Sequence, residues 1–224
     1  MYRRYAIYVT PEGELGRVGS AWLGWDVLAG QAVAHPLLDG IDLSRITKRP
    51  RKYGLHATVK PPMVLRDGAT IEALELAAGQ ITENFAPVEL SGLEVSWIGS
   101  FLALTPQGDT AALNTLASTI VAQLDHFRAP PSCEELAQRR KRPLTPSQEA
   151  NLVRWGYPHV MEDFRFHITL TGPLKDAARI SPAVVAHFAN VLSKPFIIDH
   201  LSIAGEEEDG MFHRIARLPL GGKT

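Results

Sequence analysis

Cysteine is nearly absent from this chain, and so are the long apolar runs that mark membrane and secreted proteins. A single cysteine, Cys133, cannot form an intramolecular disulfide, so nothing favours an oxidising compartment. No stretch approaches the roughly 18 apolar residues that a membrane span needs. The apolar run near the N-terminus is too short for a signal-peptide core. A cytoplasmic protein with no membrane partner is therefore expected.

The chain also lacks a surplus of charge of either sign. It has 23 lysines and arginines against 24 acidic residues, a formal net charge of −1. Without a basic surplus, no general nucleic-acid binding is expected, and recognition of an anion has to be local. Two basic runs, 45–52 and 139–142, are candidates to rim a cleft and attract an anionic substrate, the alternative being solvated surface.

Hydrophobic residues make up 45% of the chain and follow alternating strand and helix patterns. The Pro-rich and then basic segment 129–142 is expected to be a connector or a loop over a site. Thr145 and Gln148 form a capping-box signature ahead of a helix. Helices are predicted over 15–33, 71–85 and 113–127, from Thr145, and over 182–192. Strands are predicted over 5–10, 55–60 (ending at two prolines), 88–97, 101–105, 164–170, 196–204 and 212–218.

Two parts of the chain have similar layouts. The string HATVKPP begins at His56 and HITLTGP begins at His167, and each is followed by a helix and then by two strands. Such a repeat indicates a duplicated lobe. We therefore expect one domain over 1–224, built of two pseudo-symmetric lobes with motif-bearing units at about 55–106 and 166–219. The order of elements favours an α+β fold with antiparallel sheets.

The histidine and threonine of each string are two residues apart, so in a strand they share a face. His56 and Thr58 then form one pair, and His167 and Thr169 form the other. One neutral histidine can activate water or a hydroxyl, while the other, protonated, donates to a leaving oxygen. The threonine hydroxyls can donate to phosphate oxygens as charge develops. This set suits a small phosphodiester and requires no metal or cofactor.

The paired strings, 111 residues apart, resemble the 2H phosphoesterase superfamily, which includes RNA cyclic phosphodiesterases and 2′–5′ RNA ligase-like proteins. The longer strings RYAIYVTP, YGLHATVKPP, LTPSQEANLVRWGYPHV and FRFHITLTGPL are similar to the subgroup encoded alongside phosphonate-degradation genes. The resemblance implies two antiparallel sheets flanked by helices around a central cleft. It also implies catalytic roles for His56 and His167, phosphate-binding roles for Thr58 and Thr169, and hydrolysis of a small cyclic phosphodiester. It leaves the substrate open.

Several further residues are candidates to bind substrate. Strand alternation puts Lys60 on the face of Thr58 and Arg165 on the face of His167, near a phosphate; the alternative for both is solvent. Tyr8 and Tyr157 are candidates to stack on a base or hold a sugar, the alternative being core packing. Arg142 belongs to the second basic run.

Three other functions remain open at this point. One is a metallohydrolase, although the chain has no HExxH and no CxxC string. Another is a module of the same fold that binds a phosphorylated ligand or an RNA end without turnover. The third is covalent chemistry at Cys133, whose glutamate neighbours do not favour a thiolate. The near equivalence of the two motifs leaves undecided which histidine is the acid and which the base.

Overall fold

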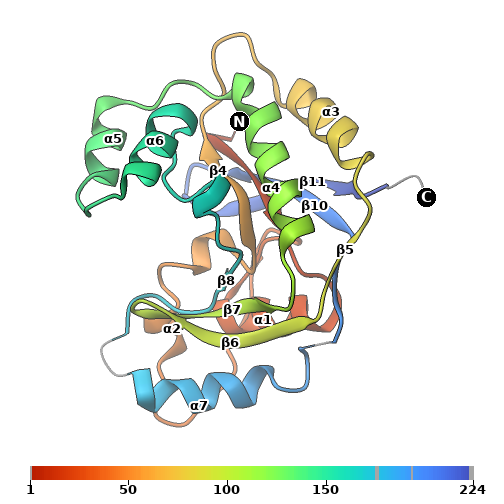
Figure 1. Cartoon of the computed structure of the whole chain (residues 1–224). Coiled ribbons are helices and arrows are strands. Elements are labelled where there is room, and N and C mark those ends of the chain that lie inside the picture. The colour runs from red at the N-terminus through yellow and green to blue at the C-terminus, as the bar shows by residue number, and fades with distance from the viewer. Residues whose placement is uncertain (1, 175–176, 193, 222–224) are drawn as a thin grey trace.

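The computed structural model describes residues 2–174, 177–192 and 194–221 and confirms the expected α+β class (Figure 1). The strands are β1 (Arg4–Val9), β2 (Trp25–Asp26), β3 (Gln31–Ala32), β4 (Ala57–Met63), β5 (Val88–Leu90), β6 (Gly92–Ile98), β7 (Phe101–Gln107), β8 (Ile168–Thr169), β9 (Phe196–Ile198), β10 (His200–Glu206) and β11 (Phe212–Pro219). The helices are α1 (Gly13–Leu23), α2 (Leu43–Ile46), α3 (Ile71–Thr82), α4 (Ala111–Gln123), α5 (Cys133–Arg139), α6 (Pro146–Trp155) and α7 (Ala177–Phe188), with 3-10 turns η1 (Arg51–Tyr53), η2 (Asp125–Phe127) and η3 (Met161–Asp163).

Seven strands form an antiparallel sheet in the order β11-β10-β1-β4-β8-β7-β6. The sheet has two sections, β11-β10-β1-β4 and β8-β7-β6, which meet at a single pair of residues, Ala57 and Ile168. The two sheets expected from the sequence are therefore continuous at a narrow seam. That seam lies within the two sequence motifs.

The strands of the two motif-bearing units are exchanged in the sheet. The β6–β7 hairpin of the first unit pairs with β8 of the second, and the β10–β11 hairpin of the second lies in the section that contains β4. β1, which precedes both units, is the neighbour of β4, whereas the neighbour of β8 is β7. β11 is an outer edge strand. β5 and β9 pair with each other. The units therefore do not correspond strand for strand, and two pseudo-symmetric lobes stay a prediction.

Several elements differ from their predicted bounds for local reasons. β4 continues through its two prolines to Met63, because β8 contacts it only at Ala57 and the register against β1 is irregular at the prolines, so their missing N–H groups interrupt no regular ladder. The strand expected over 164–170 shortens to β8. α1 ends ten residues before its predicted end, at Gly24 with φ +80°. α5 forms where a loop was expected, because Ser132 and Glu135 make a capping box.

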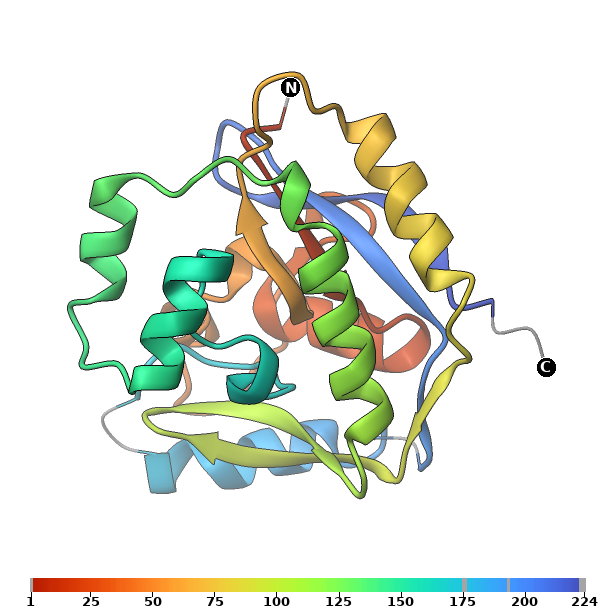
Figure 2. The same cartoon turned by 45° about the horizontal axis from the view of Figure 1, so that its top comes forward.

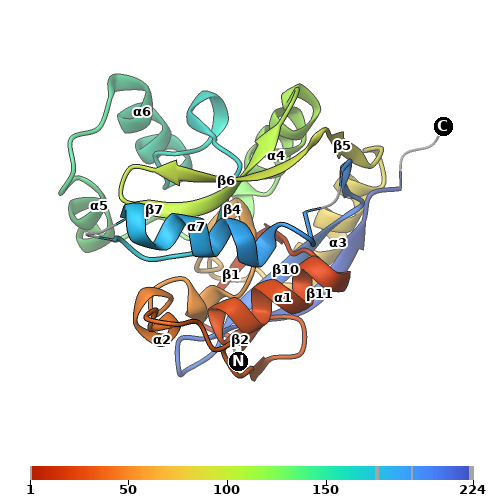
Figure 3. The same ribbon diagram turned by 90° about the horizontal axis from the view of Figure 1, so that it is seen from below.

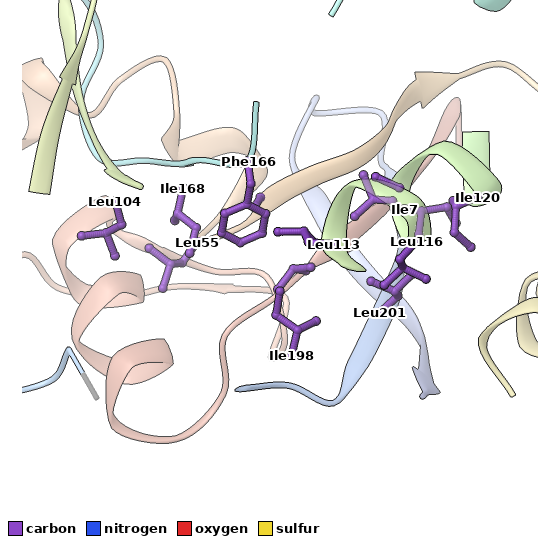
Figure 4. Close-up of a cluster of buried hydrophobic side chains, with 14 of the residues drawn as sticks. Ile7, Leu55, Leu104, Leu113, Leu116, Ile120, Phe166, Ile168, Ile198 and Leu201 are labelled. Atoms are coloured by element: carbon purple, nitrogen blue, oxygen red, sulfur yellow. The ribbon is translucent and has the colours of Figure 1, made fainter. Parts of the chain in front are cut away.

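The larger of two hydrophobic clusters in the described part of the chain includes residues of all seven strands of the main sheet. α4 packs on β4, and α3 packs on β10 and β11. Figure 4 shows buried side chains of β1, β7, β8, β10 and α4 gathered in this core, among them Ile7, Leu104, Ile168, Leu201 and Leu116. α7 lies beside the β6–β7 hairpin and α1 (Figure 3). α5 and α6 lie on the side of β4 opposite α3 (Figures 1 and 2). Residues of α2 and α5 line one cavity.

Candidate active site

The polar side chains of the two motifs meet where β4 and β8 pair. The residue between His56 and Thr58 lies opposite the residue between His167 and Thr169. Continuing this antiparallel register by one residue in each direction sets His56 beside Thr169 and Thr58 beside His167. Such cross-strand neighbours have Cβ atoms about 4.5–5.5 Å apart. All four side chains are half-buried and line one cavity, so two histidines and two threonines form a square on its floor.

The two histidines are held by the same contact. Nδ1 of His56 lies 3.0 Å from the carbonyl oxygen of Gly54, and Nδ1 of His167 lies 2.8 Å from that of Arg165. A carbonyl oxygen only accepts, so Nδ1 donates in both rings. The hydrogen bond fixes the tautomer and leaves each Nε2 without that proton when the ring is neutral. Each motif thus presents Nε2 as its reactive atom.

Gly54 is required for the first of these contacts. Its φ of +67° lies in the left-handed region, and a Cβ at this position would come within 2.5 Å of Cβ of Val27. Only glycine fits such a close approach at positive φ without a shift of the neighbouring backbone. The turn ahead of β4 therefore depends on Gly54 to aim its carbonyl oxygen at His56.

His56 has a more enclosed and aromatic environment than its counterpart. Its ring centroid is 4.0 Å from that of Tyr8 and 5.6 Å from that of Tyr53. Burial lowers the pKa of His56 to about 4, the hydrogen bond to Gly54 opposes this, and the charge of His167 lowers it further. His56 is therefore neutral near pH 7. His167 has a single ring neighbour among the described residues, Phe101, with centroids 5.9 Å apart.

Tyr8 is fully buried in the cavity wall. Its hydroxyl has no hydrogen-bond partner among the residues that the structure describes, and burial raises the pKa of Tyr8 well above its ordinary value. Tyr8 lies opposite Thr58 in the β1–β4 pairing. A buried hydroxyl without a partner is costly, so this group is a ready donor for a ligand beside His56. The ring of Tyr8 packs in a hydrophobic cluster, so its role in binding substrate stays a prediction.

The cavity is large and strongly cationic. Its volume is about 1740 Å³. Its lining includes two acidic residues, Asp42 and Asp163, and ten basic ones. The basic residues are Arg4, Arg45, Lys48, Arg49, Lys52, Arg139, Lys141, Arg142, Arg165 and Arg179. Because the chain as a whole has a net charge of −1, this positive charge is local, as anion recognition requires.

Both basic runs rim this cavity, which they were candidates to do. Within them, the side chains turned away from the cavity have other partners. Arg51 donates to the carbonyl oxygen of Leu23, and Arg140 forms an ion pair with Glu149 at 2.6 Å. The other basic side chains of the two runs line the cavity. Each run therefore has one arginine that contacts the rest of the protein and several basic residues that line the cavity.

Lys60 does not face the site, and the prediction that it lies near a phosphate is wrong. Its ammonium group is buried and donates to the carbonyl oxygen of Val121 at 3.1 Å and to Asp125 at 3.4 Å. The reason is a bulge. Tyr8 lies opposite Thr58, but Ile7 lies opposite Lys60, so one step on β1 matches two on β4. The bulge turns Lys60 to the core face that Ile7 occupies.

Replacing Lys60 with methionine should stabilise the protein near neutral pH. Burial lowers the pKa of Lys60 from 10.5 to about 8, although Asp125 opposes the shift. Between pH 8 and 10.5 the unfolded chain holds a proton that the folded protein has lost, so stability rises with pH there, and the full penalty applies below pH 8. Lys60→Met is expected to raise the free energy of unfolding at pH 7 by up to about 3 kcal/mol.

Urea unfolding at pH 7, 8, 9 and 10 measures this effect. The advantage of Lys60→Met should shrink as the pH rises through that window. Lys141→Met, at an exposed lysine, is the matched control and should show no such dependence. A Lys60→Met protein less stable than wild type at pH 7 would mean that the bonds to Val121 and Asp125 outweigh the cost of burial.

The remaining predicted substrate contacts all line the cavity. Arg165 is exposed and donates to the carbonyl oxygens of Glu162 and Phe164, at 3.1 and 2.7 Å. Tyr157 lies under the guanidinium group of Arg139, which is 4.3 Å from the ring centroid. Arg142 is exposed on the rim. Their roles in binding stay predictions.

Three residues near the two motif histidines were not among the predicted site residues. Tyr53 and Phe101 contact the two motif histidines, and His159 lines the same cavity. Burial lowers the pKa of His159, and the charge of His167 contributes to the shift. Tyr53 lies three residues before His56 in the same string, a signal that could have identified it. Phe101 and His159 had no such signal, because tertiary packing alone brings them to the site.

The alternatives to two-histidine chemistry lie elsewhere in the fold. Within the described ranges, the side chains that come close enough to share a metal ion are Glu207, Asp209 and His213, and these do not line the cavity. Cys133 is exposed and also lies outside it.

None of the helices in the described part of the chain has both the length and the apolar character needed to cross a bilayer.

Two known proteins with similar sequences are about twice as long as this chain. It is 37% identical over 232 residues to "Ribose 1,5-bisphosphate phosphokinase PhnN" of Janthinobacterium sp. (strain Marseille), covering 98% of this chain and 51% of that protein. The protein of the same name from Laribacter hongkongensis (strain HLHK9) is 33% identical over 221 residues, covering 96% and 51%. The chain thus spans about half the length of the curated relatives it matches.

The fold is similar to that of a solved structure. The crystal structure of E. coli LigT in apo form superposes with a TM-score of 0.50 at 14% identity, covering 97% of each chain. At this identity the similarity shows the fold alone, and it confirms the 2H phosphoesterase fold that the sequence strings imply. Residues 58–213 match the family described as "Protein of unknown function (DUF1045)". Since that match spans more than half of the sequence, the chain belongs to the DUF1045 family.

Proposed function

We propose that this protein hydrolyses a small, cyclic phosphodiester by general acid–base catalysis with His56 and His167 and without a metal ion. One observation carries the proposal. Both imidazoles are fixed through Nδ1 by a backbone carbonyl two residues upstream, and both line one cationic cavity with Thr58 and Thr169. A pair of equally prepared Nε2 atoms around one site is what a concerted proton transfer needs.

The unequal environments of the two histidines support different roles. His56, with its lowered pKa, is neutral near pH 7 and takes a proton from the attacking water. His167, in its protonated form, gives a proton to the leaving oxygen. One P–O bond forms to the water oxygen, the bond to the leaving oxygen breaks, and the ring opens to a phosphomonoester. Pairs of groups whose surroundings separate their proton affinities commonly divide the acid and base roles in this way.

The threonines and the basic wall would stabilise the charge on phosphorus. Thr58 and Thr169 offer hydroxyl donors beside the two imidazoles, where they can bind non-bridging oxygens. Arg165, two residues before His167, adds a guanidinium group to the same wall. A bound anion also raises the proton affinity of nearby imidazoles, which favours the protonated acid once substrate is present.

The chemical class of substrate follows from the relatives and from the sequence strings. The curated relatives are named for a ribose bisphosphate, and the strings resemble a subgroup encoded beside phosphonate-degradation genes. A cyclic phosphate of ribose or of a ribonucleoside fits both indications, and the proposed role is in phosphonate metabolism. The histidine–threonine square suits acid–base cleavage rather than the kinase activity in the relatives' name.

Turnover of cyclic phosphodiesters tests the proposal. The purified chain should open ribose cyclic phosphates or 2′,3′-cyclic nucleotides at an unchanged rate in excess EDTA, with a bell-shaped pH profile. Because the pKa of His56 is lowered to about 4, the acid limb of kcat/KM should lie below the ordinary histidine value. A rate lost on chelation would favour a metallohydrolase. Binding of these compounds without turnover would favour a non-catalytic module.

A further inference from the structure

Within the described residues, four cations of the cavity wall have neither an ion pair nor a side-chain hydrogen bond. Arg4 pairs with Glu206 at 2.5 Å, and the other lining cations mostly contact carbonyl oxygens, aromatic rings or Asp42. Within the described ranges, no ion pair or side-chain hydrogen bond is formed by Lys48, Arg49, Lys141 or Arg142. They belong to two separate walls, with Lys48 and Arg49 following α2 and the other pair following α5.

Lys48 and Arg49 are presented by an anchored turn. The amide of Gly172 donates to the carbonyl oxygen of Ile46 at 2.6 Å, so the end of the second motif is joined to the residues just before Lys48. Gly172 also lies against the stem of Arg49, since a Cβ on it would be 3.8 Å from Cβ of Arg49. On the other side the segment continues to Tyr53, beside His56. The segment that carries Lys48 and Arg49 is therefore in contact with both catalytic motifs.

The cavity is larger and has more positive charge than the binding of a single phosphate requires. Its volume of about 1740 Å³ is larger than the ~300–1,000 Å³ of most small-molecule sites. Its two acidic residues are engaged: Asp42 caps α2, and Asp163 accepts from Ser147 and Asn151. Within the described residues, neither forms an ion pair with Lys48 or Arg49. This wall has unbalanced positive charge beyond the histidine–threonine square.

We propose that Lys48 and Arg49 form a second anion subsite, which binds a phosphate group of the substrate other than the one that is hydrolysed. The inference rests on the proposed function and narrows it to a cyclic phosphodiester that also has a phosphomonoester. Guanidinium and ammonium groups together form charge-assisted hydrogen bonds to phosphate oxygens, the guanidinium in a bidentate geometry. The second phosphate orients the ring so that its diester lies between the two imidazoles.

A small sugar phosphate fits this wall better than an RNA chain does. Binding of single-stranded nucleic acid relies on aromatic faces open to bases. Here Tyr53 has Lys52 over its ring at 4.6 Å, and Tyr157 has Arg139 at 4.3 Å. Tyr8 is fully buried against His56. These faces are occupied, whereas the free cations are available to phosphate.

Kinetics on matched substrates test the subsite. Adenosine 2′,3′-cyclic phosphate is compared with the same compound bearing a 5′-phosphate, and a ribose cyclic phosphate with its 5-phosphate. Wild type should prefer the phosphorylated member of a pair by about tenfold or more in kcat/KM. Lys48→Gln/Arg49→Gln should remove this preference by raising KM for that member alone. Lys141→Gln/Arg142→Gln removes the same two charges from the other wall and is the charge-matched control for a general effect of the field. Arg66→Gln, at an exposed arginine outside the cavity, is the control for a change at a remote surface.

Two results would overturn the subsite while leaving the proposed function standing. One is equal turnover of both members of each pair, and the other is an equal effect of Lys48→Gln/Arg49→Gln on both. If no diester is hydrolysed, the proposed function fails, and calorimetry with ribose 1,5-bisphosphate and ribose 5-phosphate still decides the subsite. Tighter binding of the bisphosphate, lost in Lys48→Gln/Arg49→Gln, supports it; equal binding refutes it. Tighter binding of an oligonucleotide with a cyclic end would replace it by RNA recognition.

Discussion

His56→Ala and His167→Ala are each expected to lower kcat for a cyclic phosphodiester by about 100-fold or more, because each removes a positioned proton-transfer group. The double variant should lose far less than the product of the two single effects, since the histidines act as a unit. Thr58→Val should cost less, about 2–3 kcal/mol of transition-state stabilisation, as expected for one donor to the developing charge.

Steady-state kinetics on the purified variants, with and without EDTA, measure these losses. His126→Ala is the matched control, because His126 is exposed in η2 and does not line the cavity. It should retain wild-type activity. Full activity in either motif variant would remove the two-histidine mechanism. Strictly multiplicative losses in the double variant would mean that the two side chains do not share one reaction step.

Trp22→Ala is expected to cause the largest loss of stability, about 3–5 kcal/mol, by leaving a large cavity in the core. Trp22 is fully buried on α1, packs 5.6 Å from the Phe188 ring of α7, and donates its indole N–H to the carbonyl oxygen of Leu170 at 2.8 Å. Leu170 follows directly after Thr169. The side chain therefore packs in the core and also holds the backbone next to the second motif through its hydrogen bond.

Trp22→Phe separates the two contributions of this side chain. It keeps most of the packing and removes the hydrogen bond, so we expect a smaller loss, about 1–3 kcal/mol for the carbonyl left without its donor. Denaturant unfolding of both variants gives the free energies. Similar stability of Trp22→Ala and wild type would contradict the packing argument. A loss in Trp22→Phe as large as in Trp22→Ala would assign the whole effect to the hydrogen bond.

The elements that sequence patterns predicted well are those in which the side chains decide the backbone locally. The capping box of Thr145 and Gln148 forms as predicted, and α3 begins at Ile71, where the helical spacing begins. The alternation that pairs His56 with Thr58 also holds, because it depends only on strand geometry over three residues. The same rule failed two residues later at Lys60, where the bulge against β1 reverses the face.

The sequence by itself determined which residues are the candidates for the chemistry: two histidines and two threonines in matching strings, with basic runs as candidates to attract an anion. The tertiary structure decided how they are arranged. The β4–β8 seam, the carbonyl contacts at Nδ1 and the aromatic enclosure of His56 all join residues far apart in the chain. Periodicity reports only neighbours within one element. Strand register and burial depend on which surfaces pack together. The same packing places Arg49 in the cavity wall and turns Arg51 away from it, and it gives the two similar motifs different surroundings.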